Sequence, residues 1–188
     1  MGAWRGNKLS QRAATVAFVD SRALEEQAQA QKTRITQLYD AEGEENWVEL
    51  KRELVLTMET GCGIYREGEG MQATLQTIHD LQARYRNIRL QDKSQAYNTE
   101  LMQCLELGYG LDIAEATCLG ALERKESRGA HKRLEEGLQQ RDDVNYLKHS
   151  QVFFNADGPA ELRWQDVDTH LSAPAERAYG DAGKGVKQ

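Results

Sequence analysis

The residues of this sequence best suited to chemistry lie in one charged stretch, 124–149. Its arginines can each bind a carboxylate through two parallel hydrogen bonds, and a glycine among them permits a tight backbone turn. One hypothesis is a solvent-exposed connector whose ion pairs contribute only ~0–1 kcal/mol each. The other is a segment that docks a partner protein, with the candidate docking residues Glu126, Ser127, Arg128, Gly129, His131, Arg133, Arg141, Asp142, Asp143, Lys148 and His149.

The sequence lacks the motifs of common catalytic and cofactor sites. It contains no Gly-x-Gly-x-x-Gly dinucleotide motif, no phosphate-binding loop and no Gly-x-Ser-x-Gly nucleophile motif. Its histidines are too far apart to match metal-ligand spacing, and they are His79, His131, His149 and His170. We therefore predict no catalytic, cofactor-binding or metal-binding residue in this chain.

Composition restricts the function classes further. The chain has 188 residues, a formal net charge of -6 and 39% hydrophobic residues. The acidic balance argues against a nucleic-acid-binding protein, and no run of ~20 apolar residues could span a membrane. The three cysteines Cys62, Cys104 and Cys118 form no Cys-x-x-Cys pair, and the N-terminus resembles no secretory signal. This pattern predicts free thiols in the reducing cytoplasm.

Apolar spacing and helix-end residues predict four helices, over 21–40, 44–60, 71–85 and 99–125. The second has an apolar stripe of Trp47, Leu50, Leu54 and Met58, and the glycines after it are expected to end it. A turn is predicted at 67–70, before the third helix. The connector over 86–96 is polar, and Asn98 is expected to cap the fourth helix. Ser10 is expected to cap an earlier helix.

The helix predicted over 99–125 is apolar on almost all sides, which is typical of a buried helix. Glycine inside a helix costs up to ~1 kcal/mol relative to alanine. Glycines such as Gly108 and Gly110 therefore predict close helix packing or a kink. Cys104 and Cys118 lie on the same helix and are predicted to be core residues.

Two strands are predicted after the charged stretch, over 151–154 and 161–164. The Asp-Gly pair between them indicates a hairpin, and Pro159 suits an edge position. The polar tail from residue 173 is expected to be loose. These boundaries divide the chain into a lead and helix at 1–43, a helical bundle at 44–126, a charged docking segment with the hairpin at 127–180, and a tail at 181–188.

Several runs of the sequence resemble one known family. Ala121-Leu-Glu-Arg-Lys-Glu-Ser-Arg-Gly-Ala-His131 and Arg141-Asp-Asp-Val-Asn-Tyr-Leu-Lys-His149 resemble the C-terminal domain of the fumarate reductase flavoprotein subunit. Met58-Glu-Thr-Gly-Cys-Gly-Ile-Tyr-Arg66 is similar to a segment of the same domain, and Glu106-Leu-Gly-Tyr-Gly-Leu-Asp-Ile-Ala-Glu115 also fits. Succinate dehydrogenase flavoproteins share the pattern more loosely. The matching runs occur in the family's order between residues 45 and 179.

The resemblance implies a mainly α fold. It would be a three-helix, spectrin-repeat-like bundle with an N-terminal helix and a C-terminal extension carrying a small β-hairpin. In the family, the complete enzyme transfers electrons between quinol and fumarate and binds FAD covalently in a separate flavin-binding domain. The implied partners are that domain and the iron–sulfur subunit of a membrane-associated respiratory complex. The implied location is the cytoplasm, at the cytoplasmic face of the inner membrane when the complex is assembled.

The sequence departs from the family in lacking the FAD fingerprint, the flavin-linked histidine and the substrate-binding histidine and arginine residues. Gly2-Ala-Trp-Arg-Gly-Asn-Lys-Leu-Ser10 matches the family's catalytic arginine run too poorly to give Arg5 that role. The chain alone is therefore expected to bind no FAD and to be inactive. We expect a structural and docking module of an oxidoreductase. The alternative is a stand-alone, non-catalytic helical scaffold or partner-binding protein.

Overall fold

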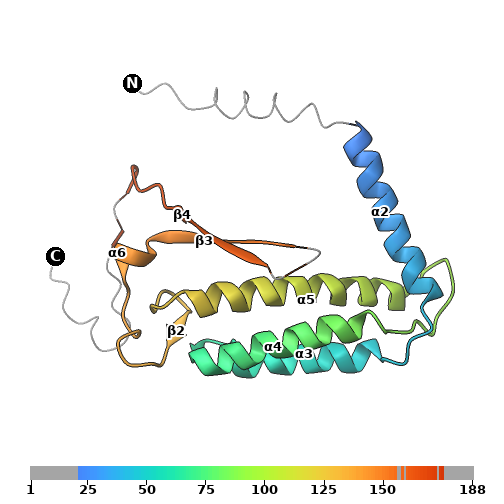
Figure 1. The fold of residues 1–188 in the computed structure, drawn as a ribbon, viewed down its shortest axis with the longest axis horizontal. Helices are drawn as coiled ribbons and strands as arrows, with labels where there is room; N and C mark the ends of the chain where they lie inside the picture. The colour runs from blue at the N-terminus through green and yellow to red at the C-terminus, as the bar shows by residue number, and fades with distance from the viewer. Residues whose placement is uncertain (1–20, 156–157, 159, 173, 176–188) are drawn as a thin grey trace. The chain divides into compact units, whose positions relative to one another are not determined.

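The computed structural model describes residues 21–155, 158, 160–172 and 174–175. The expectations for Arg5, Ser10, Pro159 and most of the tail lie outside these residues. Within them the chain is mainly helical, as predicted, with a three-helix bundle, an N-terminal helix and a C-terminal extension that carries a β-hairpin (Figure 1). The elements are α2 (Ser21–Asp40), α3 (Trp47–Gly61), β1 (Tyr65–Arg66), α4 (Gly68–Tyr85), α5 (Thr99–Glu123), β2 (Lys132–Arg133), α6 (Asp143–Tyr146), β3 (Lys148–Phe153) and β4 (Glu161–Asp166).

The chain divides into two compact units. The first comprises residues 1–55 and 79–111, and the second comprises residues 56–78 and 112–188. Each of the bundle helices α3, α4 and α5 contributes one part to each unit. None of the helices within the described ranges combines the length and the apolar character that a membrane span requires.

The apolar stripe predicted for α3 is confirmed as buried only for its middle residues, which lie in the core of the first unit. Leu50 and Leu54 are buried, whereas Trp47 is half-buried and donates its indole N–H to Glu100 Oε1 at 3.0 Å. The connector 86–96, predicted to be polar, adds two fully buried side chains, Ile88 and Leu90. Isolated apolar residues carry no periodicity, so this contribution to the core is invisible in a helical pattern.

The start of α5 is set by a residue next to it in sequence, whereas the start of α4 is satisfied by a residue far away in sequence. Asn98 caps α5 as predicted, because its side-chain oxygen accepts the backbone N–H of Leu101 at 2.7 Å. The turn predicted at 67–70 is wrong, since α4 already begins at Gly68. The N–H of Gly68 is bonded at 2.7 Å to the carboxylate of Glu135, so a residue distant in sequence satisfies this helix start.

The close packing predicted for the glycines of α5 is confirmed at Gly108 but not at Gly110, where a Cβ would meet only Leu54 Cδ2 at 3.9 Å. A Cβ at Gly108 would lie 2.4 Å from Nη2 of Arg34 and 2.7 Å from the hydroxyl of Tyr85, so α2 and α4 both approach the α5 backbone there. Arg34 also places its guanidinium 4.6 Å from the ring centre of Tyr109. The prediction that α5 is buried on all sides is wrong, because apolar side chains on one face stay exposed, namely Met102, Tyr109 and Ile113.

The second unit contains both two-stranded sheets. Strands β3 and β4 form the predicted hairpin, which is longer than expected and pairs antiparallel from Lys148 with Asp166 to Phe153 with Glu161. Part of its connecting loop lies outside the described residues. Strands β1 and β2 pair in parallel, with Tyr65 opposite Lys132, and this pairing was not predicted. The unit's core includes side chains from the bundle helices, among them Met71, Ile78, Ala114 and Cys118.

Candidate functional site

The charged stretch folds around one buried carboxylate, that of Glu126, whose side chain is 0% exposed. Oε1 accepts hydrogen bonds from Arg124 Nη1 and Arg128 Nε, both at 2.7 Å. Oε2 accepts Arg128 Nη2 at 2.9 Å and the backbone N–H of Asp142 at 2.7 Å. Burial alone would raise the pKa of this carboxyl, but the four hydrogen bonds outweigh it and lower the pKa below its usual value. The bidentate arginine pairing predicted for Arg128 is therefore present, within the chain itself.

Further pairs extend this network to α6. Arg128 also bonds Asp143 through Nη2 and Oδ1 at 2.7 Å, and Arg141 Nη2 lies 2.8 Å from Asp143 Oδ2. Asp142 caps α6, because its Oδ1 accepts the backbone N–H of Val144 at 3.0 Å. The stretch thus contains internally paired charges around a buried centre, which differs from the exposed connector of the first hypothesis.

Arg133 anchors the stretch to the end of α5. Its side chain is 4% exposed, and its Nη1 donates to the carbonyls of Ala121 and Leu122 at 3.4 and 3.2 Å. The last carbonyls of a helix lack partners within it and favour a nearby cation. Arg133 Nε also donates to Glu135 Oε2 at 3.0 Å, and this pairing lowers the pKa of Glu135 to about 2.

Arg124 joins the same helix end to the hairpin. It donates to the carbonyl of Tyr146 at 2.8 Å and to that of Lys148 at 2.7 Å, where β3 begins. Its guanidinium lies 5.1 Å from the ring centre of Trp164 on β4. Sequence reasoning missed Arg124 as a candidate and missed Trp164 as its partner, because nothing in their spacing links them.

The remaining candidates divide between this network and the hairpin. Ser127 accepts the N–H of Arg133 at 2.9 Å and donates to the carbonyl of Leu138 at 2.8 Å. Gly129 has φ of 60° in the predicted tight turn, which favours glycine. Lys148 contributes its backbone carbonyl, and His149 is exposed on β3.

His131 is held in one tautomer by two neighbours. Arg66 can only donate, so its Nη1 donates to Nδ1 of His131 at 2.8 Å. The proton therefore resides on Nε2, which donates to the carbonyl of Arg124 at 3.0 Å. Burial lowers the pKa of His131, as do the charges of Arg66, Arg133 and Arg124, against an opposing effect of the backbone hydrogen bond.

The His131 environment predicts a loss of stability in mild acid. An unfolded histidine takes up a proton as the pH falls below about 6.5, whereas the folded His131 resists protonation. The unfolded state then binds more protons, so the free energy of unfolding decreases between about pH 7.5 and 5.5. Urea unfolding at these two pH values should show a smaller decrease for His131→Gln than for the wild type. His149→Gln is the control and should behave like the wild type. Equal decreases in all three proteins would refute the assignment.

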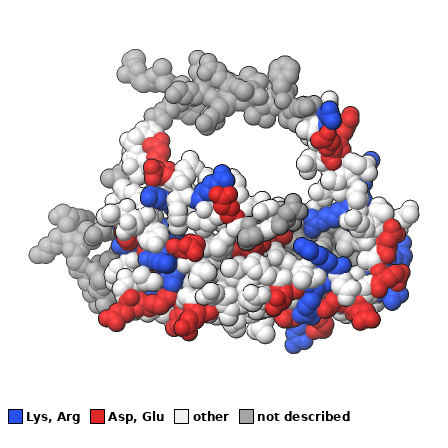
Figure 2. All heavy atoms as spheres, viewed as in Figure 1, with Lys and Arg blue, Asp and Glu red and all other residues white. Residues whose placement is uncertain are grey.

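The accessible charges at this site are of both signs. Arg128, Arg141 and Asp143 retain 28%, 29% and 35% side-chain exposure, whereas Glu126 and Arg133 are inside. Positive and negative side chains are interspersed on the face seen in Figure 2. Among the described residues, no group of three or more histidine, cysteine or acidic side chains is arranged to hold a metal ion. The arrangement therefore suits recognition of a surface of mixed charge.

Comparison with known proteins gives consistent matches. The family described as "Fumarate reductase flavoprotein C-term" matches residues 51–179. The fumarate reductase flavoprotein subunit of Escherichia coli strain K12 is 44% identical over 179 residues, and that of Proteus vulgaris is 41% identical over 179 residues. Each alignment covers 95% of this chain and 30% of the relative, so the chain spans under a third of these proteins.

The fold of the chain also matches part of a solved fumarate reductase structure. The structure of the E. coli quinol fumarate reductase superimposes with a TM-score of 0.82 at 44% identity. The superposition covers 93% of this chain and 30% of the solved chain. The similarity therefore includes the bundle as well as the charged stretch that first pointed to the family.

Proposed function

The chain belongs to the fumarate reductase flavoprotein C-terminal family, and on that premise we propose that it serves as the structural and docking domain of a flavoprotein subunit in anaerobic respiratory electron transfer. The observation that carries this proposal is the alignment of 95% of the chain with 30% of a curated fumarate reductase flavoprotein subunit. A domain of that size normally meets the rest of its subunit through an inter-domain interface.

In this proposal the chemistry belongs to the remainder of the subunit. FAD and the fumarate site would lie in the flavin-binding part, outside the region that this chain matches. The sequence of this chain contains no dinucleotide-binding motif, which supports that division. The purified chain is expected to show no flavin absorbance and no oxidation of reduced viologen by fumarate.

The proposed partners are the flavin-binding part and an iron–sulfur subunit. One solved relative is described as quinol-fumarate reductase with menaquinol molecules, which supports assembly into a respiratory complex. We place this chain in the cytoplasm, at the inner face of the membrane when it is assembled.

We assign the docking contact to the accessible rim of the charged network. Three of the candidate residues form hydrogen bonds inside the folded segment and so stabilise it rather than face a partner; they are Glu126, Ser127 and Arg133. Arg128, Arg141 and Asp143 keep accessible atoms and lie together through direct pairs. Gly129 and the exposed His149 also remain available to a partner. Rim charges mainly set association rate and specificity, so single changes there should weaken binding without abolishing it.

Co-purification with the flavin-binding part of the E. coli subunit tests the proposal. The wild-type chain should bind it, and Arg141→Ala should bind several-fold more weakly at low salt. Arg163→Ala is a matched control, because Arg163 forms an exposed pair with Glu161 on the hairpin. Equal binding by both variants would place the contact elsewhere on the chain. If the folded wild-type chain does not bind at all, the proposed function is wrong.

A further inference from the structure

One tyrosine of the first unit is completely exposed to solvent. Tyr97 lies in the loop formed by residues 92–98, directly before α5, and its relative exposure is 102%. Among the large hydrophobic and aromatic side chains that the structure describes, no other is exposed to this extent. An aromatic ring that stays in water contributes no burial of apolar surface to the folding of the chain. The position of Tyr97 is therefore not explained by the stability of this chain alone.

The backbone at Tyr97 is also in an unfavourable conformation. Its φ is 56°, and within the described part of the chain it is the only residue other than glycine with a positive φ. The left-handed conformation brings the Cβ atom close to the following carbonyl oxygen, and glycine avoids this contact. Such strain persists only where the surrounding structure fixes it, and it is found most often at functional sites. The chain thus places a bulky aromatic residue where glycine would cost less.

Hydrogen bonds on the C-terminal side of Tyr97 fix the loop that carries it. The side-chain amide of the buried Asn98 donates to the carbonyls of Asp92 and Ser94 at 2.8 and 3.0 Å. The carboxylate of Glu100, in the first turn of α5, accepts the backbone N–H of Asp92 at 2.6 Å. The loop is therefore closed on the start of α5, and the backbone at Tyr97 is pre-organised.

Both charged side chains of the loop form hydrogen bonds within the chain. Lys93 Nζ donates to the carbonyl of Tyr39 near the end of α2, where a cation is favoured. Asp92 Oδ1 accepts the backbone N–H of Ser94 at 2.8 Å. The residues at positions 95, 96 and 98, next to Tyr97, are uncharged. The ring is therefore presented without an adjacent charge, which suits it to an apolar pocket.

We propose that Tyr97 is an aromatic anchor that inserts into an apolar pocket of the flavin-binding part of the subunit. This inference rests on the proposed function. The matched region is only 30% of the E. coli subunit, so most of such a subunit lies outside it and can cover the ring. Tyrosine is enriched among the residues that dominate interface energies, because its ring is buried while its hydroxyl still forms a hydrogen bond. A pre-organised anchor also loses little conformational freedom on binding.

The affinity of variants at position 97 for the flavin-binding part of the E. coli subunit tests the proposal. Tyr97→Ala should bind at least ~10-fold more weakly than the wild type, whereas Tyr97→Phe should retain most of the affinity because it keeps the ring. Tyr97→Gly should bind as weakly as Tyr97→Ala but melt at a higher temperature, because glycine relieves the left-handed conformation. Tyr65→Ala is the matched control, since Tyr65 is 68% exposed in the second unit, and it should bind like the wild type.

Hydroxyl-radical labelling of the full chain locates the contact directly. In the complex Tyr97 should become protected, whereas Tyr65 should stay reactive. Equal binding by the wild type and Tyr97→Ala, or an unprotected Tyr97 in the complex, would overturn this inference and leave the proposed function in place. Self-association of the chain that depends on Tyr97 would also overturn it, because the ring would then contact a second copy. If the folded wild-type chain does not bind at all, both the inference and the proposed function are wrong.

Discussion

Replacing Glu126 by alanine is expected to lower the free energy of unfolding by about 3–5 kcal/mol. The buried carboxylate accepts hydrogen bonds from Arg124, Arg128 and the backbone of Asp142. Its removal leaves the side chain of Arg124, which is 13% exposed, without its carboxylate partner. Breaking a buried pair on one side costs more than the pair contributes, because the remaining charge stays desolvated.

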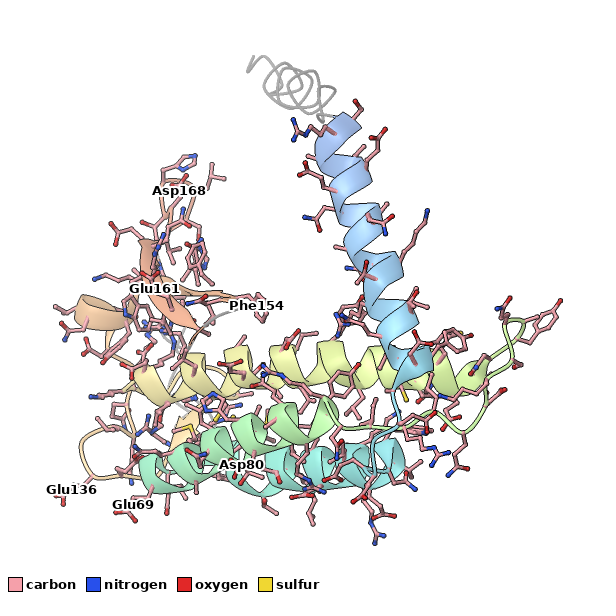
Figure 3. All side chains as sticks on the ribbon, turned by 45° about the vertical axis from the view of Figure 1, so that its right-hand side comes forward. Glu69, Asp80, Glu136, Phe154, Glu161 and Asp168 are labelled. Carbon is pink, nitrogen blue, oxygen red and sulfur yellow. The ribbon has the colours of Figure 1, made fainter. Side chains whose placement is uncertain are left out.

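Urea unfolding measures this loss, and limited proteolysis of the native state locates it. Cleavage should increase within 124–147, because that segment folds around the lost carboxylate. Glu136→Ala is the matched control, since Glu136 is exposed and points outward in Figure 3. Glu136→Ala should unfold like the wild type. If Glu126→Ala did the same, Glu126 could not be the centre of the network.

Replacing Gly43 by alanine is expected to destabilise the first unit by about 2–3 kcal/mol. The new Cβ would lie 1.8 Å from the carbonyl oxygen of Asn87 and 2.3 Å from its carbonyl carbon. That carbonyl accepts the N–H of Glu45 at 3.1 Å, and Glu45 in turn pairs with Arg84 at 2.8 Å. Backbone atoms cannot rotate away as a side chain can, so the connection between the start of α3 and the end of α4 must shift.

Thermal unfolding with Gly70→Ala as the control tests this contact. A Cβ at Gly70 meets no atom within 4 Å, and the residue lies in α4. Alanine there should leave the stability unchanged or raise it by up to ~1 kcal/mol. Similar melting temperatures for the two variants would show that the chain at Gly43 does not approach Asn87 so closely.

The helices could be predicted from sequence wherever their signals are local. The range of α2 follows from its apolar spacing, and α5 begins directly after its cap, Asn98, which accepts the N–H of Leu101 in the first turn. The start of α4 could not be predicted, because Glu135 bonds Gly68 from a distant part of the chain. The exposed face of α5 also escaped prediction, since apolar composition does not show what covers a helix in the folded chain.

The kinds of interaction in the charged stretch could be predicted from sequence, but the specific residues that pair with each other could not. Arginine residues near carboxylates and a glycine turn are visible in the sequence, and both occur in the structure. The choice of Glu126 as the common acceptor depends on its burial, which follows from tertiary packing. Arg124 and Trp164 meet only because the hairpin folds back toward the end of α5. The docking role of the stretch remains a prediction.

A chimeric subunit tests most directly whether this chain serves as the C-terminal domain of a fumarate reductase flavoprotein. In the E. coli subunit, the matching 30% would be replaced by this chain, and fumarate-dependent oxidation of reduced viologen would be measured. The chimera should hold flavin and turn over fumarate, whereas the subunit truncated before the matching segment should be far less active. A chimera that folds and holds flavin but is no more active than the truncated subunit would contradict the account.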